Sequence, residues 1–93
     1  MSSRSGWTFL TNHALVLLCV ASTPRISLRE IGDRVGVTER AAHRIVADLA
    51  AAGYLVVRKD GRRNLYEVQT DVMLRHREAS HVQVGALLDL LLP

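Results

Sequence analysis

Two adjacent stretches in the middle of the chain carry apolar residues at helical spacing. In the first, Leu28, Ile31 and Val35 are three or four positions apart. In the second, apolar residues occupy the i, i+3, i+4 and i+7 positions: Ala42, Ile45, Val46 and Leu49. Residues at this spacing lie on one buried face of a helix, with polar residues on the other. The pattern predicts two amphipathic helices between residues 27 and 53.

Capping residues mark where these two helices begin and end. Ser27 can cap the first helix, and Glu30, three residues later, completes a capping box. Thr38 can cap the second helix, which Gly53 ends. Gly36 suits the left-handed residue that follows a helix. Two helices joined by such a tight turn are typical of a helix-turn-helix.

A further helix is expected before this pair, beginning at Thr8 or Thr11 and ending near Ser22. Trp7 and Phe9 just before it are expected to be packing anchors. Its predicted inner face carries three residues, Leu15, Leu18 and Cys19. Because this helix is apolar on most sides, more than one partner should bury it, which is a first indication of a dimer.

Short strands are expected on either side of the helix pair. Pro24 ends the first helix and leaves Ile26 in a short extended piece. Residues 54–59 are rich in strand-forming side chains, Asp60-Gly61 predicts a hairpin turn, and residues 65–68 form the return strand. An isolated hairpin is marginal in water, so it should lean on the helices or pair with Ile26.

A last helix is predicted over residues 77–92. Its apolar stripe, which has more leucine than one small core needs, favours a dimer interface made by Val84, Leu87, Leu88 and Leu91. Residues 1–93 then form a single domain in the order helix, short strand, helix, helix, strand, strand, helix. This is a mainly α fold with a small β-hairpin wing, in the α+β class, with its core in residues 7–68.

Charge adds a candidate function to this architecture. The net charge is +3, and eleven of the twelve basic residues are arginine, which makes bidentate contacts with phosphates and guanine edges. Arg40 and Arg44 lie one turn apart, opposite the apolar stripe of the second helix. The hairpin adds four more cations: Arg58, Lys59, Arg62 and Arg63. The two clusters favour nucleic acid as the partner.

Other chemistry is poorly supported by the sequence. A single cysteine, Cys19, excludes an intramolecular disulfide, and no cation near it would lower its pKa. No nucleophile with a neighbouring base, carboxylate pair or phosphate-binding loop is present, so an enzyme is not expected. Glu78 and His81 offer only two ligands on one helical face, so neither a metal nor another cofactor is expected.

No signal peptide or membrane span is expected, which places the protein in the cytoplasm, on the nucleoid.

The motifs resemble the winged helix-turn-helix transcriptional regulators of bacteria and archaea, nearest to MarR- or ArsR-like proteins. The resemblance rests on the order and spacing of Ile31-Gly32, Val35-Gly36-Val37, Thr38 to Ile45, Gly53-Tyr54-Leu55 and Gly61 to Asn64. In this family a small residue at the Gly32 position lets the two helices approach closely. Asp60 departs from the pattern, since an acid at the wing tip argues against deep insertion into a minor groove.

The resemblance implies a homodimer that binds double-stranded DNA, with a recognition helix over residues 38–52 in the major groove and a wing over residues 58–64 on the minor groove or backbone. The residues that it assigns to DNA are Ser27, Arg29, Thr38, Glu39, Arg40, His43, Arg44, Lys59, Arg62 and Arg63. Two alternatives stay open: a winged helix used for protein–protein contact, and a regulator that responds to a metal or small ligand.

Overall fold

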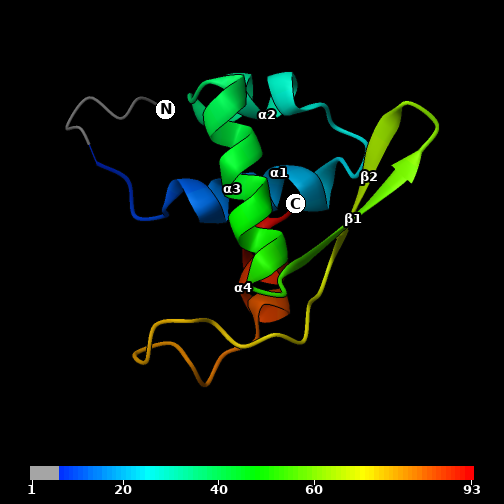
Figure 1. Cartoon of the computed structure of the whole chain (residues 1–93). Coiled ribbons are helices and arrows are strands. Elements are labelled where there is room, and N and C mark those ends of the chain that lie inside the picture. Colours follow the sequence, from blue (N-terminus) through cyan, green and yellow to red (C-terminus); the bar gives the residue numbers. More distant parts are fainter. Residues whose placement is uncertain (1–6) are drawn as a thin grey trace.

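Four helices and one two-stranded antiparallel hairpin make up residues 7–93 in the structure, which is a computed structural model (Figure 1). Residues 1–6, on which the expected absence of a signal peptide partly rests, lie outside the described part of the chain. The elements are α1 (Asn12–Ser22), α2 (Leu28–Val35), α3 (Glu39–Ala51), β1 (Leu55–Asp60), β2 (Arg63–Val68) and α4 (Val84–Leu91). Within residues 7–93, no helix is long and apolar enough to cross a membrane.

The first three helices begin at capping hydroxyl groups. The side chains of Thr11, Ser27 and Thr38 each accept a hydrogen bond from the backbone N–H three residues later, at 3.2, 3.1 and 3.0 Å. The Glu30 carboxylate in turn accepts from the Ser27 backbone N–H at 3.0 Å, which confirms the predicted capping box. This backbone hydrogen bond lowers the pKa of Glu30 below its ordinary value. The starts of α1, α2 and α3 therefore follow from local sequence.

The helix-turn-helix depends on the absence of a side chain at Gly32. A Cβ atom placed there would lie 2.6 Å from the carbonyl oxygen of Val37 and 3.3 Å from the carbonyl carbon of Thr38. Gly36 then adopts a left-handed conformation with φ of 89° and donates its N–H to the Gly32 carbonyl. The turn and the first residues of α3 are thus pressed directly against α2.

The buried face of α1 differs from the predicted one. Val16, Leu17 and Val20 are buried, whereas the expected residues, Leu15, Leu18 and Cys19, are only partly buried. Since α1 is apolar on nearly every side, its sequence pattern could not select the face that meets α2 and α3. Trp7 and Phe9 are not packing anchors: they are 61% and 94% exposed and contact each other edge to face.

The hairpin turn lies one residue later than predicted. Asp60 pairs with Arg63 across the two strands, so the turn consists of Gly61 and Arg62 rather than Asp60 and Gly61. Gly61 has a φ of 66°, and no non-glycine residue in the described chain has a positive φ. A glycine at the first position of a two-residue turn is the arrangement of a type II′ turn. This shift puts the Arg62 side chain at the tip.

The expected strand at Ile26 does not form. Only one backbone hydrogen bond joins this segment to the hairpin, from the Tyr66 N–H to the Pro24 carbonyl at 2.9 Å. Pro24 has no N–H to return, and the Ile26 N–H is bonded to the Thr23 carbonyl at 3.0 Å. The segment therefore packs against the hairpin through the buried side chain of Ile26 without continuing the sheet.

The last helix is shorter than the predicted range of 77–92, since α4 begins at Val84. The preceding residues run back along residues 72–74, with hydrogen bonds from the Leu74 N–H to the Val82 carbonyl and from the Val84 N–H to the Val72 carbonyl. Met73 and Gln83 form a single antiparallel bridge between the two segments. These backbone contacts keep Gln83 extended, with ψ of 144°, so the helix cannot begin earlier.

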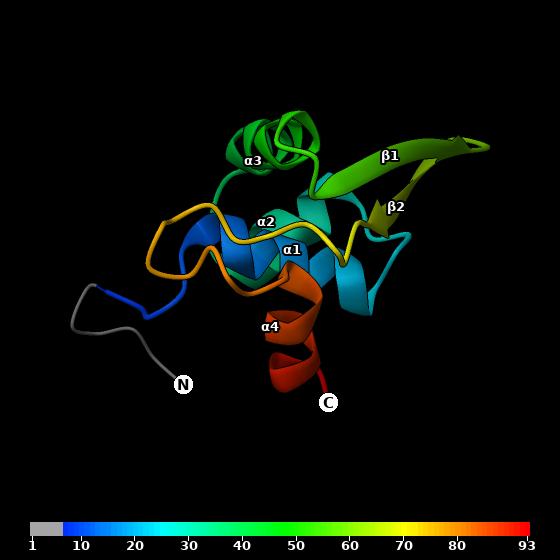
Figure 2. The same ribbon diagram turned by 90° about the horizontal axis from the view of Figure 1, so that it is seen from below.

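The elements are arranged around α1. In Figure 2, α3 and the hairpin lie on one side of α1, and α4 projects from the opposite side. The core joins all six elements, and its least exposed large side chains are Val16, Val20, Ile26 and Ile31. The outer surface of α3 is therefore left open to a partner.

We expect Gly32→Ala to lower the free energy of unfolding by about 1–3 kcal/mol, because its Cβ atom would overlap the Val37 carbonyl and the backbone cannot move aside. Denaturant unfolding measures the change. A control is Asp33→Ala at the neighbouring exposed position, which should stay within about 0.5 kcal/mol of the parent chain. A glycine in the interior of an uncrowded helix would instead be stabilised by alanine, so the sign of the change tests the close approach.

Candidate nucleic-acid interface

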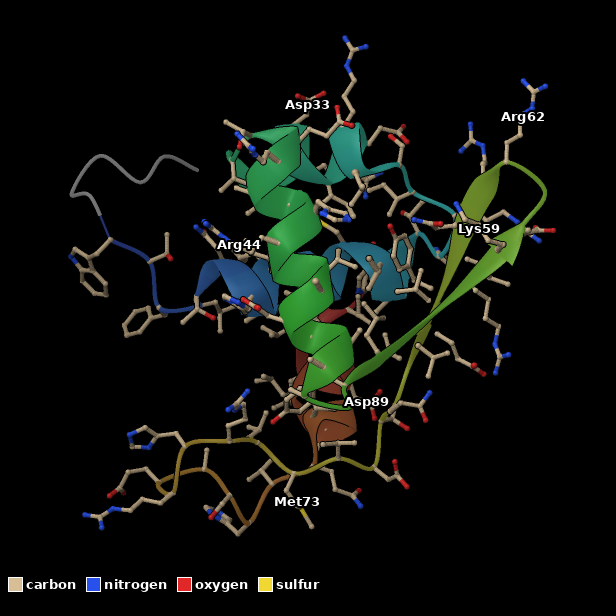
Figure 3. The ribbon with its side chains drawn as sticks, in the orientation of Figure 1. Asp33, Arg44, Lys59, Arg62, Met73 and Asp89 are labelled. Carbon is tan, nitrogen blue, oxygen red and sulfur yellow. The ribbon has the colours of Figure 1, made fainter. Side chains whose placement is uncertain are left out.

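The outer face of α3 carries an exposed basic strip. Ala42, Ile45, Val46 and Leu49 are buried against α1 and α2, which turns Arg40, His43 and Arg44 outward. Arg40 and Arg44 are one helical turn apart, and the Arg44 side chain extends away from the core (Figure 3). A shallow hollow of about 320 Å³ lies among the side chains at the start of the helix: Thr38, Arg40, Ala41, His43 and Arg44.

The start of α3 adds the Thr38 hydroxyl group and the Glu39 carboxylate to this strip. The positive end of the helix dipole lies at Thr38, and the exposed carboxylate of Glu39 is in the first turn, where that dipole favours it. A carboxylate repels phosphate but accepts a hydrogen bond from the amino group of cytosine. Ser27 and Arg29, at the start of α2, are also exposed. Ser27, Arg29 and Glu39 are therefore accessible polar groups at the starts of α2 and α3.

The cations of the hairpin divide into paired and unpaired ones. Arg58 forms an ion pair with Glu67 on the opposite strand at 3.1 Å. Lys59 and Arg62 form no ion pair among residues 7–93, and Arg62 points into solvent from the tip of the hairpin (Figure 3). Arg63 donates from Nη1 to the carbonyl oxygen of Arg25 at 3.1 Å. Arg62 and Lys59 are therefore the hairpin cations best placed for an external anion.

The charge of Asp60, next to the tip of the hairpin, is neutralised by Arg25, which lies outside the hairpin. Asp60 Oδ2 accepts a hydrogen bond from Arg25 Nε at 2.7 Å and forms an ion pair with Arg25 Nη2 at 2.5 Å. Sequence reasoning did not assign a role to Arg25. No local pattern could reveal it, since 35 positions separate the two residues along the chain.

The two basic elements lie on the same side of the molecule. α3 and the hairpin both lie above α1 in Figure 2, on the side turned toward the viewer in Figure 1. All the residues assigned to DNA from the sequence are exposed: Ser27, Arg29, Thr38, Glu39, Arg40, His43, Arg44, Lys59, Arg62 and Arg63. The surface formed by those on α3 and the hairpin is called the α3–hairpin face below.

The residues assigned to dimerisation are divided between core and surface. Val84 and Leu88 are 2% and 4% exposed and pack inside this chain, so they are not available to a partner. Leu87 is half-buried, while Leu90 and Leu91 are 84% and 42% exposed. The exposed leucines lie on α4, which projects away from the α3–hairpin face (Figure 2).

An open, largely apolar cavity of about 640 Å³ lies between α1, the end of α3 and α4. Leu17, Leu18 and Leu87 contribute to its lining. At its edge, His13 Nε2 and Asp48 Oδ2 are 2.9 Å apart and join α1 to α3. The cavity shares no residue with the hollow at the start of α3 and is separate from the basic strip.

Cys19 is partly buried in α1, close to a cation of α2. Burial raises the pKa of the Cys19 thiol, although the charge of Arg34 acts in the opposite direction. The expectation that no cation lies near Cys19 was wrong, because α2 brings Arg34 close to it. Across residues 7–93, no three His, Cys, Asp or Glu side chains are grouped so that they could hold a metal ion.

Comparison with known proteins identifies the family. The crystal structure of the PcaV transcriptional regulator from Streptomyces coelicolor, in complex with its natural ligand, has the same fold with a TM-score of 0.59 and 24% sequence identity. The match covers 89% of this chain and 60% of the PcaV chain, so the chain spans about 60% of the length of that regulator. No curated protein matches the sequence. The sequence model of the MarR family matches residues 7–63, which include the helix-turn-helix and the tip of the hairpin. The chain belongs to the MarR family.

Proposed function

We propose that this protein binds double-stranded DNA in a sequence-specific manner and regulates transcription. The observation that carries the proposal is the α3–hairpin face, where α3 exposes Arg40, His43 and Arg44 on the same side as the unpaired Lys59 and Arg62. An α-helix fits the major groove of B-form DNA, where arginine reads guanine through two hydrogen bonds. The MarR family membership supports the same function.

In this proposal the residues assigned to DNA make two kinds of contact, with base edges and with the backbone. Arg40, His43 and Arg44 read base edges, and Glu39 accepts from a cytosine amino group. Ser27, Arg29 and Thr38 contact phosphates and so set the position of α3 in the groove. Lys59 and Arg62 reach the backbone or the neighbouring minor groove. The protein would act in the cytoplasm, where its DNA lies, and no step of this function requires catalysis.

A homodimer completes the proposal. Leu90 and Leu91 are exposed on α4, on the side opposite the α3–hairpin face, so a second copy bound there leaves both α3 helices open to DNA. These adjacent exposed leucines support the dimer, because a contiguous exposed apolar patch often marks an interaction site. Two-fold dimers of this class contact half-sites about one helical turn, roughly 34–36 Å, apart.

Selection of bound sites from random duplex DNA tests the function and the dimer together. We expect an enriched motif with two inverted half-sites about 10 base pairs apart, because each copy would place one α3 helix in the major groove. A single half-site would support DNA binding by a monomer. No enrichment, with equally weak binding at low and high salt, would instead favour the winged helix as a protein–protein module.

We expect Arg44→Ala to weaken binding to the selected site by about 5- to 150-fold, the cost of one lost bidentate base contact, while binding to unrelated duplex changes little. Fluorescence anisotropy with matched selected and scrambled duplexes measures the ratio. Arg77→Ala, which removes an equal charge from an exposed position between β2 and α4, serves as the control. Equal losses for both variants on both duplexes would remove Arg44 from the base-reading set.

Arg62→Ala should weaken binding to all duplex sequences to a similar extent and reduce the slope of log K against log salt by about 1, as expected for one lost phosphate contact. The structure favours Arg62 over Arg63 for this role, since Arg63 is bound to the Arg25 carbonyl. A titration over several salt concentrations gives the slope. An unchanged slope would mean that the hairpin tip does not touch the DNA backbone.

A further inference from the structure

We infer that Arg25 positions the wing: it holds both ends of the Gly61–Arg62 turn and so sets where Arg62 meets DNA. This inference rests on the proposed function for its purpose, although the contacts themselves can be tested without DNA. Arg25 belongs to the connection between α1 and α2 and is not part of the α3–hairpin face as the sequence defined it.

Two different groups of Arg25 contact the two residues that flank the turn. Asp60 and Arg63 are the last cross-strand pair before the tip. The Arg25 guanidinium donates a hydrogen bond from Nε to Asp60 Oδ2 at 2.7 Å, and its Nη2 forms an ion pair with the same oxygen at 2.5 Å. The Arg25 carbonyl accepts from Arg63 Nη1 at 3.1 Å. One residue therefore contacts the end of β1 through its side chain and the start of β2 through its backbone. We call this set of contacts the Arg25 clamp.

Arg25 is itself held in place by the core. Its neighbour Ile26 is 1% exposed, and the carbonyl of Pro24 accepts from the N–H of Tyr66, which is 3% exposed. The Pro24 ring further limits the backbone at this point. The clamp thus connects the outer end of the hairpin to a fixed part of the domain, next to the buried Ile26.

The outer half of the hairpin has little else to hold it. Residues 57–63 are all exposed, and the buried residues of the two strands, Leu55 and Tyr66, lie closer to its base. A two-stranded hairpin without further support is marginally stable in water. The clamp therefore limits how far the Arg62 side chain can move relative to α3, which reduces the ordering cost of binding.

The clamp should matter for binding more than for stability. The side chains of Arg25 and Asp60 are 60% and 45% exposed, and exposed ion pairs contribute little to folding. Asp60 also carries a negative charge near the DNA, so electrostatics alone predicts that its removal strengthens DNA binding. A positioning role predicts the opposite sign. The two explanations can therefore be separated by one substitution.

The decisive variant is Asp60→Ala in the full chain, and its matched control is Glu67→Ala. Glu67 is also an exposed hairpin carboxylate paired with an arginine, Arg58, but it makes no contact with Arg25. Affinity for duplex DNA is measured by anisotropy at two salt concentrations. We expect Asp60→Ala to weaken binding about 3- to 10-fold and Glu67→Ala to leave it equal or tighter.

Arg25→Ala should weaken binding to a similar extent, and the double variant Arg25→Ala/Asp60→Ala should lose little more than either single variant, since both remove the same contact. Melting temperatures should stay within about 5 °C of the parent chain. Binding by Asp60→Ala that equals or exceeds that of the parent chain would overturn the clamp.

Limited digestion with trypsin tests the clamp without DNA. Cleavage after Arg62, followed by mass spectrometry, should be about threefold faster or more in Asp60→Ala and Arg25→Ala, because the turn opens more often, and unchanged in Glu67→Ala. Equal cleavage rates in all variants would overturn the clamp. If the parent chain fails to bind duplex DNA while these rates differ as expected, the proposed function is wrong and the clamp stands.

Discussion

The close approach of α2 to the turn before α3 is the constraint on which the rest of the structure depends. Gly32 has no Cβ atom, so the Val37 carbonyl can lie where that atom would be, and the first residues of α3 are held against α2. This contact sets the angle at which α3 leaves the turn. With Ala42, Ile45, Val46 and Leu49 buried beneath it, the polar face of α3 can only point outward. The outward direction of Arg40 and Arg44 is therefore a consequence of backbone packing.

Charge pairing then decides which cations of this outward surface are available. The hairpin carries four basic residues in sequence, but Arg58 is paired with Glu67 and Arg63 is bound to the Arg25 carbonyl. Asp60, which would repel DNA, is neutralised by Arg25. The hairpin thus presents a smaller positive surface than its composition indicates, centred on Lys59 and Arg62. A count of arginines overestimates the number of phosphate contacts that such a wing can make.

On the side of the domain opposite the α3–hairpin face, the burial of apolar residues matters more than charge. α4 is apolar on most sides, and it divides its apolar residues between the core and the surface. Val84 and Leu88 enter the core, while Leu90 and Leu91 stay outside it. The dimer prediction therefore depends on fewer residues than the leucine stripe indicated. An apolar cavity between α1 and α4, with the His13–Asp48 pair at its edge, lies on this same part of the domain, apart from the basic strip.

By itself, the sequence determined the helix-turn-helix, because the features that specify this motif are local. Capping hydroxyl groups, the helical spacing of apolar residues and the turn at Gly36 all act within a few positions. The basic face of α3 followed from the same periodicity. Only the tertiary structure decided the buried face of α1 and the late start of α4, since both depend on contacts with other segments of the chain. The same is true of Arg25, whose contacts with Asp60 and Arg63 span 35 and 38 positions of the chain. Such pairs leave no periodic pattern, because folding alone brings the two residues together.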